Sequence, residues 1–420
     1  ILNQMKKVLI IAHDFPPLNS IGAQRPYSWY KYFKENELYP IVFAKNWNSD
    51  NSDSIKINKS GEIHLIKCEM VFRNNFSKIP FLGIWIRKFL TFFEYILKWK
   101  TIKIDHTNSL YRSAHNYLKN NKVDIIIATG EPWILFKYAA TMSKEFEIPW
   151  IADYRDGWNT NVTLEYNRFA QILSKIYFKK IEKKIISTAC MLSFSDPCES
   201  LKISKITNEK KIITPFNGYD NDLINNLKDL PASEDILTIS YAGTIYDFQD
   251  LKSFLLGLNE FIKNNGIENI KVNFFGSKNN QLTIDRINQI NPDLFDYINL
   301  TPKIPQKEVI DLLKSSHVLL LLADKKHVAL PAKVFEYIAL ERTILVSTND
   351  KSDVERFVKE TKSGIICDNS KEIYNALVLL FDKFQKNSNF KVEIKEKETY
   401  SRQQQAMILS DYIKKTLQNI

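Results

Sequence analysis

The sequence predicts an α/β protein built from two doubly wound parallel sheets, and three observations lead to this prediction. Short apolar runs recur along the chain, and they are continuous rather than alternating, as in parallel strands covered on both faces. Segments with helical periodicity separate these runs. A polar stretch at 218–236 then interrupts the pattern, which begins again after it. Two successive α/β domains joined by a linker are therefore expected.

The predicted elements follow one another in a regular order in both halves. In the first half, helical segments such as "AQRPYSWYKYFKEN" and "WILFKYAATMSKEF" lie between predicted strands at 7–14, 39–46, 123–130, 149–156, 189–196 and 210–217. In the second half, strands are predicted at 236–244, 270–277, 297–304, 317–324, 342–349 and 363–368. The expected domains are 1–220 and 237–400, with a helix over 401–420 that packs back on the first domain.

Composition narrows the class of protein. Of 420 residues, 44% are hydrophobic and 25% are charged, which is typical of a globular chain with more than one domain. The four cysteines show no C-x-x-C spacing, which argues against a zinc site or a disulfide framework and suits a reducing compartment. No apolar run approaches the roughly 18 residues that a spanning helix needs. The net charge of +10 suits an anionic partner, although base composition and solubility alone would also explain it.

Residues 79–103, "IPFLGIWIRKFLTFFEYILKWKTIK", interrupt the rhythm of the first half. On a helical wheel, Trp85 and Phe89 lie on one side and Arg87 lies on the other. Large aromatic side chains combined with many basic ones are typical of a helix that lies in a membrane interface. The sequence thus predicts attachment to an anionic membrane surface; a core-packing helix is the alternative.

The segment "LPAKVFEYIAL" (330–340) predicts a helix that begins just after a strand, with Lys333 and Glu336 one turn apart. Ligands of open α/β sheets bind at the carboxyl ends of the strands, where helix N-termini favour phosphate groups. Pro331 suits a first helical turn, and Lys333 adds a cation. A carboxylate at Glu336 would accept hydrogen bonds from sugar hydroxyls. The pair therefore indicates a nucleotide; an exposed ion pair is the alternative.

Other polar groups also follow predicted strands. Gly22 lies in "DFPPLNSIGAQR", before a helix, and Gly243 and Thr244 follow the strand "SYA". In "ADYRDGW" the sequence places Asp153, Arg155 and Asp156 together, a density of charge that a sheet core does not hold without a purpose. His13, after the first strand, is in position to contact the cleft, but a lone histidine is more often structural.

In combination, "DFPP…GAQRPY", "ATGEPW", "IPWIADYRDGW", "NGYD", "YAGTIY" and "LPAKVFEYIAL" resemble the GT-B glycosyltransferases of family 4, in the branch that synthesises bacterial surface polysaccharides. The resemblance runs in order from about residue 6 to 348. It implies two Rossmann-like domains that face each other across a cleft. It also implies that the second binds a nucleotide-activated sugar and the first binds the acceptor. Catalysis without a metal and with retention of anomeric configuration follows from the same resemblance.

Two departures from the family pattern affect the donor site. The family commonly carries two glutamates eight positions apart; Glu336 matches the second, but Val328 stands where the first would be. Many members also place Arg and Lys after the "G-T" strand to hold the diphosphate, and "GTIYDFQD" offers neither. Lys333 is therefore the expected phosphate cation.

The resulting hypothesis is a metal-independent, retaining glycosyltransferase that uses a UDP or GDP sugar and a lipid-linked or other surface-polysaccharide acceptor. It needs no cofactor, binds no nucleic acid, and acts in the cytoplasm on the inner face of the cell membrane. Lys333 is expected to stabilise the leaving diphosphate, and Asp153 or Asp156 to orient or deprotonate the acceptor, while Arg155 fixes one of these carboxylates or binds an acceptor phosphate. The expected substrate contacts are Gly22, Ala23, Arg155, Gly243, Thr244, Gly276, Ile304 and Glu336. A nucleotide-sugar epimerase of similar fold and a basic nucleic-acid-binding protein are the alternatives.

Overall fold

The computed structural model describes residues 5–47, 57, 59–68, 99–101, 105–159, 168–205, 207, 211–228, 230, 232–266, 268–323 and 330–419. The chain forms two compact units. The first comprises Ile1–Asn217 together with Gln403–Ile420, and the second comprises Gly218–Arg402. The amphipathic segment at 79–103 lies outside the described residues except for 99–101.

The first unit is built on a seven-stranded parallel sheet with the order β3-β2-β1-β4-β5-β6-β7. Its strands are β1 (Lys6–Ala12), β2 (Leu38–Lys45), β3 (Glu62–Ile66), β4 (Ile125–Gly130), β5 (Trp150–Tyr154), β6 (Met191–Phe194) and β7 (Lys211–Ile213). Its helices are α1 (Ile21–Tyr32), η1 (Phe33–Asn36), α3 (Asn108–Asn120), α4 (Ile134–Phe146), α5 (Arg168–Ile186), α6 (Pro197–Ser204) and α14 (Arg402–Gln418).

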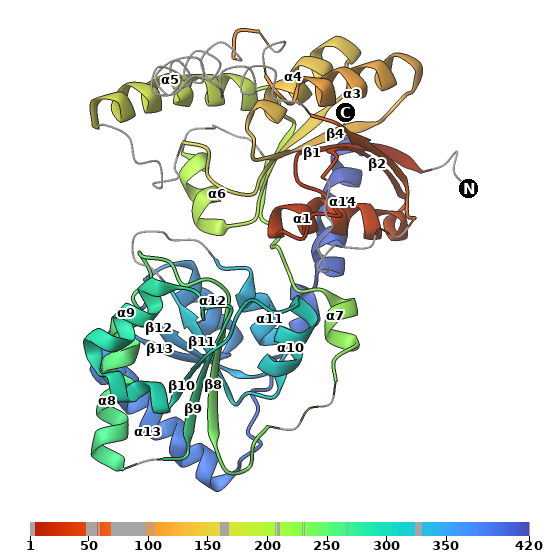
Figure 1. Cartoon of the computed structure of the whole chain (residues 1–420). Helices are drawn as coiled ribbons and strands as arrows, with labels where there is room; N and C mark the ends of the chain where they lie inside the picture. Colours follow the sequence, from red (N-terminus) through yellow and green to blue (C-terminus); the bar gives the residue numbers. More distant parts are fainter. Residues whose placement is uncertain are drawn as a thin grey trace. The chain divides into compact units, whose positions relative to one another are not determined.

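Helices cover both faces of this sheet, which explains why its strands are continuously apolar (Figure 1). Leu9 and Ile11 of β1 point into a core shared with α3, α4 and α5. Val8 and Ile10, which alternate with them, point into a second core that contains Trp29 of α1.

The C-terminal helix α14 completes the second of these cores. Leu409 and Ile413 of α14 are fully buried in the same cluster as Val8 and Trp29. The side-chain amide of Asn36, at the end of η1, donates to Ser410 Oγ at 2.6 Å. Figure 1 shows α14, in blue, beside α1, in red, although these helices come from opposite ends of the sequence.

The second unit contains a six-stranded parallel sheet with the order β10-β9-β8-β11-β12-β13. Its strands are β8 (Leu237–Ala242), β9 (Ile270–Phe275), β10 (Ile298–Leu300), β11 (Val318–Leu322), β12 (Thr343–Ser347) and β13 (Gly364–Cys367). Its helices are α7 (Asn221–Asn225), α8 (Leu251–Asn265), α9 (Gln281–Ile290), η3 (Pro292–Asp296), α10 (Gln306–Lys314), α11 (Lys333–Ala339), α12 (Asp353–Thr361), α13 (Ser370–Lys386) and η4 (Lys397–Tyr400).

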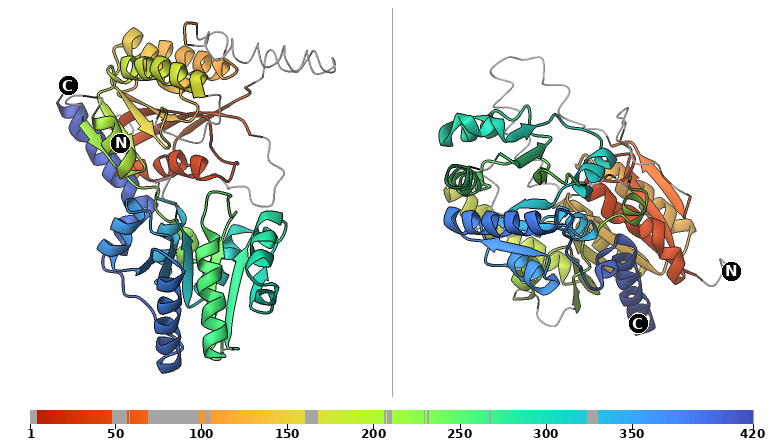
Figure 2. Two further views of the ribbon diagram at one scale, coloured as in Figure 1. Left: turned by 90° about the vertical axis from the view of Figure 1, so that its left-hand side faces the viewer. Right: turned by 90° about the horizontal axis from the view of Figure 1, so that it is seen from below.

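Helices α8 and α13 lie side by side on one face of this second sheet (Figure 2). Phe254 and Leu258 of α8 and Leu377 and Leu380 of α13 share a core with the strands. Counted from its first strand, the sheet has the order 3-2-1-4-5-6, which is that of the Rossmann fold. The order reverses between β8 and β11, as it does between β1 and β4 in the first unit. These two positions are the topological switch points, where ligands bind in this class of sheet.

The structure confirms the predicted fold class, since each unit is a parallel sheet with helices on both faces. That the two units face each other across a cleft stays a prediction. All twelve predicted strands are present, and β3 is an additional strand at the sheet edge, where all five of its residues are half-buried. The polar stretch expected to be a linker contains the short helix α7, which belongs to the second unit.

Candidate functional site

Charged groups of the first unit gather at the carboxyl ends of β1, β4 and β5. His13 and Asp14 follow β1, Glu131 follows β4, and Arg155 and Asp156 follow β5. Because β1 and β4 flank the switch point, these side chains occupy the place where the fold binds ligands.

Asp153 lies one layer below this group and has a structural role. Its side chain is 0% exposed and accepts hydrogen bonds from Arg25 Nη2, Thr129 Oγ1 and Ser193 Oγ, each at 2.8 Å. Arg25, which is itself buried, also donates to the carbonyl of Pro215 at 2.9 Å. The network joins α1, β4, β5, β6 and the chain after β7. A carboxylate enclosed in this way has no free oxygen lone pair directed at an acceptor, so we infer a structural role for Asp153 and leave its catalytic role as an untested prediction.

Gly22 and Ala23 lie in the first turn of α1. Both are buried, and Ala23 N donates to Ser20, which caps α1. A Cβ built on Gly22 would lie 1.7 Å from Arg155 Nη1, so the missing side chain leaves room for a guanidinium group and not for a ligand. The contact with Arg155 explains why position 22 has no side chain, and the assignment of Gly22 and Ala23 as substrate contacts stays a prediction.

Arg155 links two carboxylates of the cluster. Its Nη1 lies 3.1 Å from Asp14 Oδ2, and its Nε lies 3.1 Å from Asp156 Oδ2. Asp14 also lies 2.8 Å from His13 Nδ1. Burial raises the pKa of Asp14, but the hydrogen bond to His13 and the charge of Arg155 outweigh it and hold this pKa below its ordinary value. Desolvation of the carboxyl group, and then the charge of Asp156, raises the pKa of Glu131.

The His13–Asp14 pair resembles the arrangement that prepares an imidazole as a general base. When Nδ1 carries the proton and donates to Asp14, Nε2 is left to accept one. Trp47 packs edge-on against His13, with ring centroids 5.2 Å apart, and its Nε1 donates to the His13 carbonyl at 3.0 Å. Sequence reasoning missed this pair because it treated His13 alone. The adjacent Asp14, directly after a strand, was the available signal.

The second unit has a cavity of about 260 Å³ at its switch point. Its walls come from the ends of β8 and β11, the loop that follows β8, and the segments that begin α11 and α12. Its lining side chains include Tyr241, Thr244, Tyr246, Phe248, Lys333 and Asp350.

Lys333 supplies the cavity with a cation. Its Nζ donates to the Ala242 carbonyl at 2.8 Å and lies 3.9 Å from the centroid of the Tyr241 ring. Within the described part of the chain, no carboxylate lies within 4 Å of this ammonium group. Burial lowers the pKa of Lys333 to about 8, and the charge of Glu336 opposes this shift without cancelling it. An anionic ligand would stabilise the charged form of this lysine, because a nearby negative charge offsets the cost of its desolvation.

Glu336 does not pair with Lys333, so the alternative of an exposed ion pair is wrong. Its Oε1 instead accepts a hydrogen bond from Gln306 Nε2 at 3.1 Å, and both carboxylate and lysine are half-buried. Burial raises the pKa of Glu336, although Arg402 and Gln306 favour its charged form. Pro331 precedes the helix rather than opening it, since α11 begins at Lys333.

The remaining predicted contacts fall in two groups. Thr244 lines the cavity with Lys333, and a Cβ on Gly243, which has φ +111°, would lie 3.4 Å from Lys333 Nζ. Gly276, with φ +90°, donates its N–H to Thr301 Oγ1 at 3.3 Å and does not line the cavity. Ile304 is half-buried before α10 and does not line it either.

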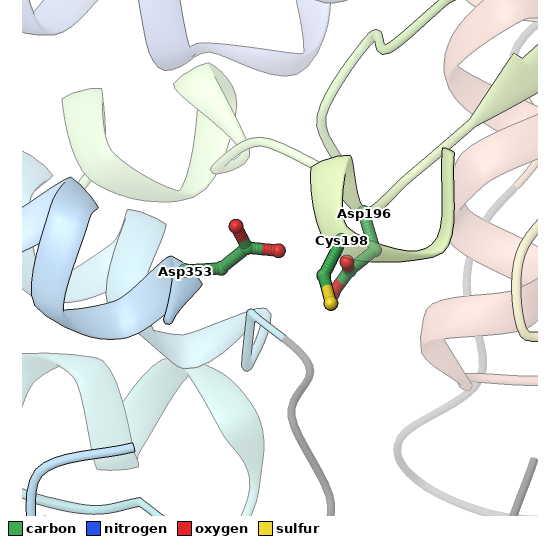
Figure 3. A group of neighbouring side chains, drawn as sticks. All are labelled: Asp196, Cys198 and Asp353. Atoms are coloured by element: carbon green, nitrogen blue, oxygen red, sulfur yellow. The ribbon is translucent and has the colours of Figure 1, made fainter. Parts of the chain in front are cut away.

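Figure 3 shows Asp196 and Cys198 at the start of α6 in the first unit and Asp353 at the start of α12 in the second. Each aspartate has a partner within its own unit: Asp196 Oδ1 accepts from Glu199 N at 3.1 Å, and Asp353 pairs with Arg356. Because this group draws on both units, we assign no metal to it. No helix among the described residues is long and apolar enough to cross a membrane.

Comparison with known proteins relates the chain to a set of solved structures. No model of a protein family matches it, and no curated protein matches its sequence. A glycosyltransferase from Rickettsia africae superposes with a TM-score of 0.65 and 14% identity, over 99% of this chain and 100% of that one. HepE from Anabaena, solved with UDP and glucose, gives 0.56 and 10%, over 99% and 100%. A UDP-N-acetylglucosamine 2-epimerase gives 0.55 and 11%, over 98% and 95%. At such identities these matches establish the fold alone.

Proposed function

We propose that this chain transfers a sugar from a nucleoside diphosphate sugar to a hydroxyl group, with the donor bound by the second unit. The observation that carries the proposal is Lys333, a half-buried cation with no carboxylate beside it among the described residues, in the cavity at a Rossmann switch point. The fold that the chain shares with a glycosyltransferase and with a protein solved with UDP and glucose supports it.

In the reaction, the bond between the anomeric carbon and the diphosphate oxygen breaks, and a bond to the acceptor oxygen forms. Lys333 stabilises the negative charge that develops on the departing diphosphate. The first unit supplies the groups for the acceptor: His13 takes the hydroxyl proton at Nε2, and Asp14 positions the imidazole. Asp156, whose side chain is 51% exposed, orients the acceptor together with Arg155.

Several finer features of the proposal rest on the family resemblance. They are a lipid-linked or other surface-polysaccharide acceptor, retention of configuration, independence of metal ions, and a location on the inner face of the membrane. Nuclear magnetic resonance of the anomeric proton tests retention, because a single displacement would invert the product. Unchanged turnover in the presence of EDTA is expected; a loss restored by a divalent cation would contradict metal independence.

The proposal as a whole is tested by thermal shift of the full chain with UDP and GDP, followed by an assay of nucleotide release from sugar nucleotides. A ligand at one hundred times its Kd stabilises the folded state by about 2.7 kcal/mol, so binding is readily detected. Failure of both nucleotides to stabilise the chain would contradict the donor site.

A nucleotide-sugar epimerase is the second candidate, because a structure of that description shares the fold. The same assay separates the two activities. A transferase releases a nucleoside diphosphate in proportion to the acceptor consumed. An epimerase converts one sugar nucleotide into another and needs no acceptor.

The lowered pKa of Lys333 predicts how nucleotide binding changes with pH. Above pH 8 the free lysine loses its proton, and a bound diphosphate restores it. The affinity for UDP or GDP should therefore fall above pH 8, by about tenfold in total by pH 10. Over the same interval the free energy of unfolding should rise with pH, because Lys333 keeps its proton in the unfolded chain after it has lost it in the folded one. Titration calorimetry in buffers of different ionisation enthalpy measures the proton uptake. A Lys333→Met variant should show no such pH dependence.

Glu336 is expected to contribute to donor binding without changing during transfer. Glu336→Gln should raise the donor KM by about tenfold and leave kcat within a factor of two, because contacts to ribose are the same in the ground and transition states. Steady-state kinetics with varied donor checks this. A fall in kcat at unchanged KM would assign Glu336 to the reacting centre instead.

The membrane prediction concerns residues outside the described part of the chain. Vesicles that contain anionic lipid should bind the protein, and salt should weaken the attachment because it screens surface charge. Replacing Trp85 and Phe89 by serine should release the protein in a flotation assay. If the double variant unfolds instead, the segment is part of the core.

A further inference from the structure

The loop between β8 and α8 presents two aromatic side chains to solvent. Tyr246 is 54% exposed and Phe248 is 44% exposed, although aromatic residues of this size usually bury most of their surface. Their rings are stacked, with centroids 5.3 Å apart and planes 3° from parallel. Both rings line the cavity that contains Lys333. The loop therefore adds a flat apolar wall to a site that already holds a cation.

Hydrogen bonds hold this loop in place. Gln249 Nε2 donates to the Leu322 carbonyl at 3.0 Å, while Gln249 Oε1 accepts from Tyr246 N at 3.0 Å. Arg286 donates to three backbone carbonyls of the loop, at 2.6, 3.1 and 3.3 Å. Asn280 donates to a fourth at 2.9 Å. The aromatic pair is thus fixed before any ligand arrives, so little ordering entropy opposes binding on it.

We propose that Tyr246 and Phe248 form the subsite for the transferred sugar, and that the apolar face of a hexose ring lies against them while its phosphate contacts Lys333. This inference rests on the proposed function. It also gives the loop a role. The family resemblance leads us to expect Arg and Lys in this loop, but the sequence has aromatic residues there.

The connectivity of a sugar nucleotide favours the hexose over the base as the occupant. The transferred sugar is bonded directly to the diphosphate, whereas the base is separated from it by the ribose. A ring that shares a cavity with the phosphate cation is therefore the sugar. At about 260 Å³ the cavity is smaller than the roughly 300–1,000 Å³ pockets that enclose drug-sized ligands, so it encloses only part of a sugar nucleotide.

Binding measurements on the full chain test this assignment. Titration calorimetry compares UDP with UDP-glucose and GDP with GDP-mannose, for the wild type and for a Tyr246→Ala/Phe248→Ala variant. We expect the variant to lose about tenfold in affinity for the sugar conjugate that the wild type binds, and less than twofold for the matching nucleoside diphosphate. Tyr246→Phe and Phe248→Trp, which keep an aromatic face, should retain most of the affinity.

Phe295→Ala provides a matched control, since Phe295 is an exposed aromatic residue of the same unit that does not line the cavity. This variant should bind both the sugar conjugate and the matching nucleoside diphosphate as tightly as the wild type does. Equal losses for the conjugate and the nucleoside diphosphate would assign the aromatic pair to the base or the phosphates and overturn the inference. Unchanged affinity for both would overturn it as well. If the wild type binds none of the four probes, the proposed function itself fails, and the inference fails with it.

Discussion

Replacing Lys333 by methionine should lower kcat by two to three orders of magnitude while donor binding weakens much less. Negative charge on the departing diphosphate grows as the glycosidic bond breaks, so a cation beside it stabilises the transition state more than the bound donor. Loss of one such electrostatic contact corresponds to roughly 2.7–4 kcal/mol. Methionine is an unbranched apolar side chain that replaces the ammonium group lying over the Tyr241 ring. Steady-state kinetics with varied donor, at pH 7, separates the effects on kcat and KM.

Stability measurements distinguish this role from a structural one. The half-buried ammonium of Lys333 has no carboxylate beside it in the described chain, so its removal relieves a desolvation cost. The urea midpoint of Lys333→Met should therefore equal or exceed that of the wild type. A lower midpoint together with near-normal kcat would show that Lys333 merely supports the helix. Lys333→Arg, which keeps the charge but changes its shape, should recover part of the activity.

The fold could be predicted from the sequence because strands that are buried on both faces of a sheet consist of unbroken apolar runs. In β1, Val8 to Ala12 are all fully buried, and an unbroken apolar run is the direct consequence. The strand that was missed, Glu62–Ile66, lies at the sheet edge, where half-burial permits polar residues such as His64. Edge strands lack the signal on which the prediction depends.

The site was predictable only where chemistry and position along a strand agreed. Lys333 and Thr244 follow strands that meet at the switch point, and they line one cavity. Asp153 and Asp156 are three positions apart, yet one is fully buried and the other exposed, because β5 ends between them. The structural role of Asp153 becomes visible only through its contact with Arg25. The two residues are 128 positions apart, so no local sequence pattern connects them.

Replacing Asp153 by alanine should destabilise the first unit by about 3–5 kcal/mol, because it leaves the Arg25 guanidinium buried without its counter-ion. The same change removes the acceptor for Thr129 and Ser193, which are also buried. Denaturant unfolding of the full chain, followed by tryptophan fluorescence, measures the loss, since Trp150 lies in the same strand. If the alanine variant does not fold, the milder Ser193→Ala, which removes one donor, should cost about 0.5–1.5 kcal/mol.

The Asp153→Asn variant separates the structural role from a catalytic one. It keeps the size of the side chain but removes the charge that balances Arg25, so its urea midpoint should fall, while kcat per folded molecule stays within about threefold of the wild type. Replacing Arg25 by methionine and Asp153 by leucine together should recover part of the stability, because no uncompensated charge then remains buried. A catalytic aspartate would behave in the opposite way. An Asp153→Asn protein with an unchanged midpoint and a thousandfold lower kcat would return this residue to the active site and contradict the structural role that its burial indicates.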